Sequence, residues 1–271
     1  MKDDIKAIFW QTIKNRKKFI IVYAIIGVTL LWMYLAMFPA IAEKSDDFNK
    51  LLESYPESFT AILGVEEINF STVENFIALE HMSIMWPIMV VLLLLGLAGP
   101  AIAGEIEKGT IELILSRPVS RVAVFAGRYL AATVALVVFI LFSIFMVFPL
   151  AALHGIEISA MNHFKVSFMG LFFGLSVLSL GMLFSVIFSE KSKVYFTTGG
   201  IVGLMYIFSV ASNLSENVAA LKYFSFFYYF DGVQVMTKSQ LNGLSVLVFL
   251  FFILLSSAFA AYHFNKRDIA V

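Results

Sequence analysis

One dense group of side chains able to do chemistry lies between two long apolar stretches of this chain, at residues 104–121. It reads Gly-Glu-Ile-Glu-Lys-Gly-Thr-Ile-Glu-Leu-Ile-Leu-Ser-Arg-Pro-Val-Ser-Arg. Its carboxylates and hydroxyls can form ion pairs and hydrogen bonds, and its leucines and isoleucines can bury area against a docked protein. A polar turn without a partner is the alternative. Since a connection between elements usually needs about four to six residues, the length of this segment favours protein contact.

We expect a short helix inside this segment. Thr110 is placed to cap a helix that begins near Ile111, and Glu112 would then lie at its positively polarised start. Arg117 precedes Pro118, and the residue before a proline disfavours helical geometry, so the helix should end there.

No catalytic or metal-binding pattern accompanies the segment. The chain has no cysteine, which excludes thiol nucleophiles, disulfides and iron–sulfur clusters. It contains neither a His-Glu-x-x-His pair nor a Gly-x-x-x-x-Gly-Lys-Ser/Thr loop that could hold ATP phosphates. We therefore predict no catalytic residue, no metal and no cofactor in this chain, so the energy for any work must enter through a partner. The four histidines fall at the ends of apolar stretches, at His81, His154, His163 and His263.

The elements that position the polar segment are predicted to be membrane-spanning helices. Hydrophobic residues make up 60% of the 271 residues, against roughly 45–50% in soluble domains. Apolar stretches of about 20 residues recur, the length that crosses about 30 Å of hydrocarbon. The sequence predicts an all-α polytopic membrane protein, with 1–271 forming a single transmembrane domain. Its six spans are placed at approximately 19–38, 83–103, 122–150, 164–188, 194–212 and 244–264.

The charges orient the spans. Most of the 19 lysines and arginines fall in segments that share a side with the N-terminus, and positive residues favour the cytoplasm. Both termini are therefore predicted to be cytoplasmic. The middle of each predicted span lacks ionisable residues, which argues against a proton- or sodium-coupled carrier. Arg128, near the start of the third span, is expected to reach toward the membrane surface.

Three segments outside the spans are also predicted to be helical. Residues 2–18 are basic and amphipathic, which indicates an interfacial helix or a charged anchor that fixes topology. The acidic outer loop has candidate helices at 46–55 and 71–80, the second opened by a capping box at Ser71 and Glu74. Residues 223–230 are rich in aromatics, as in interfacial or re-entrant helices. Four acidic residues of the outer loop lack metal-loop spacing and are interpreted as a solvated face: Asp46, Asp47, Glu66 and Glu67.

Residues 104–121 resemble the signature of type-2 (ABC-2-like) permeases of ATP-binding-cassette exporters. The shared pattern is an acidic residue, Gly-Thr, Glu-x-Leu-Leu-Ser, a proline and Ser-Arg. The ending Phe264-Asn-Lys-Arg-Asp-Ile is similar to the usual terminus of that family. The resemblance extends over the whole chain and includes an elbow-like N-terminal helix.

The resemblance implies a permease subunit, not itself an enzyme, in the cell membrane of a prokaryote. It implies two partner ATPase subunits that bind ATP and magnesium, a second permease copy in a homodimer or heterodimer, and no nucleic acid. The connector after the second span would contain the coupling helix, at about 107–116, and 189–193 would make a smaller contact. The residues expected to contact the ATPase are Glu105, Glu107, Gly109, Thr110, Glu112, Ser116 and Lys191.

The resemblance also places the translocation path between two permeases, along the first, second and fifth spans. Its candidate lining residues are Tyr23, Trp32, Met85, Trp86, Met89 and Tyr206, each of which has ordinary packing as an equal alternative. An uncharged, aromatic path suits hydrophobic or amphipathic cargo such as a peptide, toxin or antibiotic, moved outward. Two alternatives stay open: a secondary carrier that does not use ATP, and a membrane sensor or scaffold that does not transport.

Overall fold

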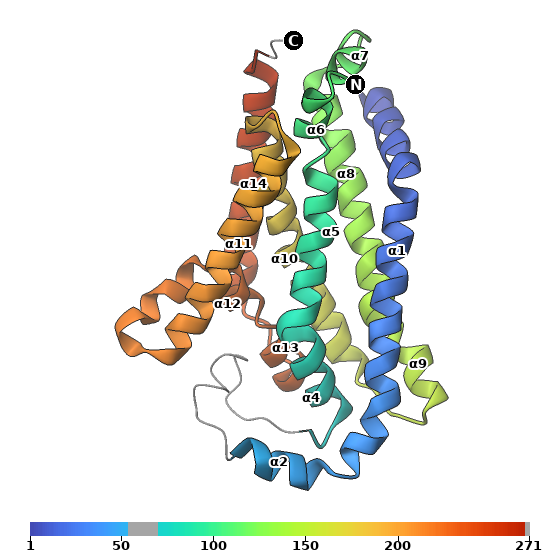
Figure 1. The fold of residues 1–271 in the computed structure, drawn as a ribbon, viewed down its shortest axis with the longest axis vertical. Helices are drawn as coiled ribbons and strands as arrows, with labels where there is room; N and C mark the ends of the chain where they lie inside the picture. Colours follow the sequence, from blue (N-terminus) through green and yellow to red (C-terminus); the bar gives the residue numbers. More distant parts are fainter. Residues whose placement is uncertain (54–69, 269–271) are drawn as a thin grey trace.

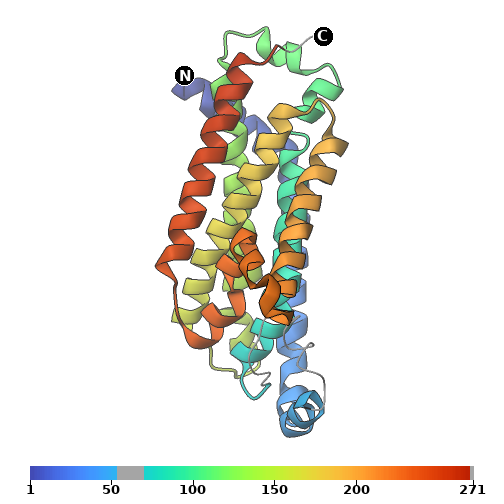
Figure 2. The same cartoon turned by 90° about the vertical axis from the view of Figure 1, so that its left-hand side faces the viewer.

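A computed structural model describes residues 1–53 and 70–268 of the chain. These residues form a tall bundle of helices, and no strand occurs among them (Figures 1 and 2). Within this described part, six helical stretches are long and apolar enough to cross a membrane. The predicted all-α fold with six spans is therefore confirmed.

The six candidate spans run along the long axis of the bundle, and some consist of consecutive helices. The N-terminus, the C-terminal end and the connector after the second span all lie at one end of the bundle, called the termini end below (Figure 1). The spans are α1 (Lys2–Ala42); α4 (Val73–Ile77), η1 (Ala78–Met85) and α5 (Trp86–Ala98); α8 (Arg121–Ile140), η2 (Leu141–Phe145) and α9 (Val147–Leu153); α10 (Ala160–Ile187); α11 (Lys191–Leu214); and α14 (Gly243–Lys266).

The first span is longer than predicted. The interfacial helix expected at 2–18 and the span expected at 19–38 are one continuous helix of 41 residues. Such a helix is about 60 Å long, roughly twice the thickness of the hydrocarbon layer. Figure 2 shows its N-terminal part slanting across the termini end before the helix runs down the bundle.

The second span begins ten residues earlier than predicted, at Val73 instead of 83. The capping box placed at Ser71 was wrong: the Thr72 side chain caps the helix by accepting from the Asn75 N–H at 3.3 Å. The Glu74 carboxylate instead accepts from the Ser159 N–H at 3.0 Å. As a consequence, Glu80 and His81 lie inside the second span, so His81 does not fall at its end as expected.

Two π-helical segments contact each other through buried side chains. His81 of η1 is fully buried, and its Nε2 lies 3.3 Å from the carbonyl oxygen of Ser143 in η2. The Trp86 Nε1–H donates to the Ser143 hydroxyl at 2.9 Å. A Cβ on Gly27 of α1 would lie only 2.9 Å from the Ser143 Cβ. The first, second and third spans therefore pack closely together at Ser143.

The small residues of α10 allow its neighbours to approach closely. A Cβ on Gly170 would lie 2.5 Å from the Trp86 ring, and one on Gly174 would lie 2.5 Å from a Leu136 methyl group. The Trp86 ring also stacks on Phe230, with centroids 5.5 Å apart. The core is therefore packed tightly around α10.

Apart from the helices of the connector, the elements outside the spans lie away from the termini end (Figure 1). α2 (Ser45–Glu53) follows the first span, and η3 (Glu216–Phe224), α12 (Phe226–Phe230) and α13 (Gly232–Lys238) follow the fifth. Helical structure around 223–230 is therefore confirmed. Glu66 and Glu67 lie outside the described residues. Across 1–53 and 70–268, no three histidine or acidic side chains gather closely enough to hold a metal ion.

Candidate functional site

The connector after the second span contains two short helices, where the sequence predicted one. α6 (Ala103–Glu107) and α7 (Ile111–Leu115) are separated by a turn at 108–110. Gly109 in this turn has φ +68, a conformation that glycine adopts readily and other residues rarely do. The backbone conformation of the turn is therefore sufficient to explain why this position is a glycine.

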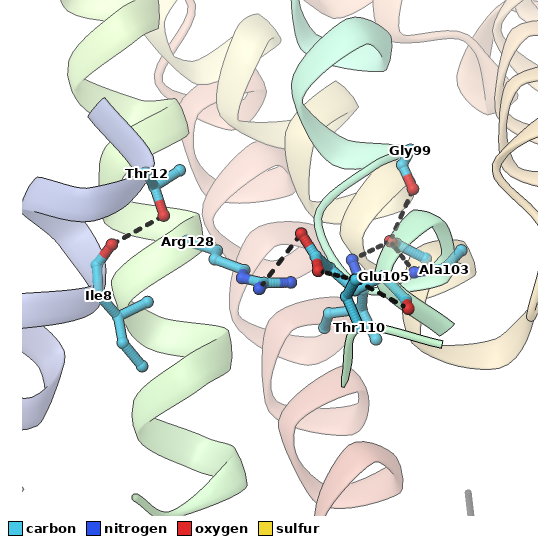
Figure 3. Close-up of polar contacts among 9 residues, drawn as sticks. Ile8, Thr12, Gly99, Ala103, Glu105, Thr110 and Arg128 are labelled. Carbon is cyan, nitrogen blue, oxygen red and sulfur yellow. Dashed lines mark hydrogen bonds and ion pairs between the residues drawn. The ribbon is translucent and has the colours of Figure 1, made fainter. Parts of the chain in front are cut away.

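The start of α6 is held by Ser185, a residue of α10 that sequence reasoning missed. The Ser185 hydroxyl oxygen accepts from the backbone N–H groups of Ile102 at 3.1 Å and Ala103 at 3.2 Å (Figure 3). The first N–H groups of a helix have no partner within the helix. A buried serine from another span therefore takes the place of a local N-cap.

Thr110 does not cap α7, although α7 begins and ends where the sequence predicted. Its hydroxyl donates to the carboxylate of Glu105, and its backbone N–H donates to the Glu105 carbonyl oxygen at 2.9 Å. The two residues therefore close the turn between α6 and α7. Because this hydroxyl turns back to Glu105, the N-terminal cap expected of its side chain is not formed.

Arg128 lies beneath the connector. Only 8% of the residue is exposed, and its Nη2 is 3.8 Å from Glu105 Oε1. Figure 3 shows the side chain reaching from α8 toward Glu105 and Thr110. The arginine was expected to reach toward the membrane surface, and it is buried against the connector at the termini end. A buried guanidinium needs a nearby negative charge, which Glu105 supplies.

Glu107 joins the connector to the fifth span. Its Oε2 accepts from the backbone N–H of Lys191, the first residue of α11, at 3.0 Å. The residue that precedes α11, Glu190, makes no cap and pairs with Lys193 at 2.6 Å instead. A carboxylate at a helix N-terminus is stabilising, by about 0.3–1 kcal/mol at an exposed site. The two segments predicted to contact the ATPase thus contact each other.

The surface of the turn and α7 is amphipathic. Ile111 is 1% exposed and anchors the helix, whereas Leu113 is 70% exposed beside the exposed carboxylate of Glu112. A carboxylate next to an exposed leucine offers both charge and apolar area to a partner. We call this the α7 surface; its exposed side chains are Lys108, Glu112, Leu113, Ser116 and Arg117.

Two arginines tie the end of the connector to the end of the chain. The Arg121 guanidinium donates to the carbonyl oxygens of Phe264, at 3.2 Å, and Arg267. Arg267 in turn donates to the Phe188 carbonyl at 3.0 Å and to the Ser189 hydroxyl at 2.6 Å. Partial burial lowers the pKa of Arg267 from its ordinary value, but an arginine remains protonated. The two sequence patterns that carried the resemblance therefore meet in space.

The candidate path residues divide by burial. Tyr23 and Tyr206 are half-buried, and Trp32 and Met85 are exposed. Trp86 is fully buried in the core of its own chain, and Met89 is 7% exposed. For these last two, the contacts are those of ordinary packing. The lining role of all six remains a prediction.

The fold and the connector define a polytopic membrane protein with an exposed amphipathic surface at the end that holds both termini. A model of the family described as ABC-2 family transporter protein matches residues 9–269. The chain therefore belongs to the ABC-2 family of transporter proteins, and it is a membrane component of a transport system. A search of curated proteins found no match.

Proposed function

We propose that this protein is the permease subunit of an ATP-driven exporter, and that a separate ATPase docks on the α7 surface. The observation that carries the proposal is the Glu107–Lys191 hydrogen bond, because it makes the connectors after the second and fourth spans one mechanical unit. In this proposal the termini end faces the cytoplasm, as the positive charges favour. The membrane is the cell membrane of a prokaryote.

The contacts of the connector support a role in transmitting force. Ser185 attaches α6 to α10, Arg128 links it to α8, and Glu107 links it to α11. A displacement of α7 by an ATPase would therefore act on three spans together. Packed helices have discrete arrangements and resist continuous deformation, so such a displacement favours a rigid-body movement.

The proposed assembly has two ATPase subunits and a second permease copy. In this proposal the second copy packs on α11, where Phe196 is 85% exposed and Ile207 is 57% exposed, and replaces lipid there. The cargo would pass between the copies. Hydrophobic or amphipathic cargo, such as a peptide, toxin or antibiotic, suits walls of this composition.

The proposal is tested by reconstituting the chain with its ATPase partner in lipid vesicles. We expect vanadate-sensitive ATP hydrolysis that rises with cargo, and cargo movement that stops without ATP. Transport that continues after the ATPase is removed would instead identify a secondary carrier. A complex that forms but neither hydrolyses ATP nor moves cargo would identify a sensor or scaffold.

A further inference from the structure

A cavity of about 680 Å³ lies at the termini end, between the first turns of α1, the connector and α8. Its floor is apolar, formed by Ile20, Leu97, Ala131 and Ala132. The rest of the lining mixes further apolar residues with polar side chains from α1, the connector and α8. The cavity is therefore amphipathic, with one part suited to hydrocarbon and another suited to charge.

Positive charge dominates the lining. Asp4 and Glu105 are the carboxylates among the lining residues. Each is already engaged: Asp4 pairs with the N-terminal amine at 3.0 Å, and Glu105 accepts from Thr110 and lies near Arg128. The remaining charge favours an anion. The four cationic side chains that line the cavity are Arg16, Lys108, Arg117 and Arg128.

Arg128 lines this cavity and has one buried, unpaired donor. The residue is more than nine-tenths buried, and its Nη1 has no hydrogen-bond partner among the residues that the structure describes. The 3.8 Å between its Nη2 and Glu105 is longer than a charge-assisted hydrogen bond, which measures about 2.7–2.9 Å. A buried guanidinium with a free N–H lacks an acceptor, and the planar fork of arginine suits phosphate oxygens.

The surroundings favour a lipid over a soluble anion. The N-terminal part of α1 carries cationic side chains and Trp10, which is 60% exposed, as at the level of membrane headgroups. The apolar floor offers a place for the first carbons of an acyl chain. We propose that this cavity binds the phosphate headgroup of an anionic phospholipid, with Arg16 and Arg128 as its ligands. This site goes beyond the proposed export function, although Lys108, Leu113 and Arg117 belong both to its lining and to the α7 surface.

The test is native mass spectrometry of the full chain purified in detergent and titrated with phosphatidylglycerol or with phosphatidylcholine of the same acyl chains. We expect one phosphatidylglycerol to bind about tenfold more tightly than phosphatidylcholine. Arg16→Gln should remove about tenfold of that affinity, because a charge-assisted contact to phosphate is lost. Lys17→Gln is the matched control, since Lys17 is the exposed next residue and does not line the cavity.

Three results would overturn the proposal. Equal affinity for the two lipids would remove the anionic headgroup as the ligand. Equal losses from Arg16→Gln and Lys17→Gln would indicate general surface charge rather than this cavity. Glycerol 3-phosphate that displaces phosphatidylglycerol at equal concentration would identify a soluble phosphate as the ligand. Arg128→Gln is a second test variant, and its unfolding temperature shows whether it folds. The folded Arg128→Gln protein should also lose its preference for phosphatidylglycerol over phosphatidylcholine.

Discussion

The carboxylate of Glu107 accepts a hydrogen bond from the backbone N–H of Lys191, at 3.0 Å. The two residues stand 84 positions apart, one in the connector after the second span and the other at the first residue of the fifth. An acidic side chain that sequence reasoning assigned to a partner is therefore used within the chain. This hydrogen bond joins the connector after the second span to the start of the fifth span, so that the two polar segments form one surface at the termini end.

Replacing Glu107 with alanine should loosen the start of α11. The Lys191 N–H loses its acceptor, so amide hydrogen exchange measured for 189–196 should rise about fivefold, the factor that corresponds to about 1 kcal/mol. Glu190→Ala is the control, because Glu190 contacts the Lys193 side chain and makes no cap. Unchanged exchange in Glu107→Ala would show that the bond does not hold the helix start.

Replacing Ser185 with alanine should destabilise the connector. The buried N–H groups of Ile102 and Ala103 would lose their acceptor, at a cost of about 1–3 kcal/mol. The unfolding temperature in detergent should fall accordingly. Ser176→Ala is a matched control on the same helix, since the buried Ser176 hydroxyl donates to the Phe172 carbonyl of its own helix. Equal unfolding temperatures for the two variants would contradict the capping role.

Replacing Gly170 with alanine should disturb the core. The new Cβ would lie 2.5 Å from the Trp86 ring, and overpacking of this kind costs about 1–3 kcal/mol. Gly203→Ala is the comparison, because nothing lies within 4 Å of a Cβ there and alanine is the better helix former. Thermal unfolding of the two variants should therefore shift in opposite directions. A stable Gly170→Ala variant would mean that α5 and α10 are less tightly packed than the structure indicates.

The sequence predicted the six spans because apolar length alone determines them. It also predicted the limits of α7, with a local stop signal at Pro118, although the cap expected from the Thr110 side chain is not formed. It predicted a helix at 71–80 but assigned it to the acidic outer loop, whereas Val73, Phe76 and Ile77 pack into the core and this helix belongs to the second span. Residues that act across long separations could not be found either. Ser185 stands in an apolar stretch and looks like any small membrane-helix residue, and its partners lie 82 and 83 positions away.

The contacts within the connector also determine which residue should be mutated to test the docking of a partner protein. Glu105 and Glu107 bond within the chain, so changes there would alter the fold of the connector as well as its surface. Glu112 is exposed on α7 beside Leu113. A charge reversal at Glu112 would therefore act mainly on a docked protein. Glu157, an exposed carboxylate between α9 and α10 at the opposite end of the bundle, is the matched control.

The central claim is that the α7 surface docks the ATPase, and its most direct test is the affinity of the detergent-purified chain for that subunit. We expect Glu112→Lys to weaken binding about tenfold or more, because a charge at an interface is reversed. Glu157→Lys should bind as the wild type does, and both variants should insert into the membrane normally. Wild-type affinity in Glu112→Lys, or an equal loss in Glu157→Lys, would contradict the claim.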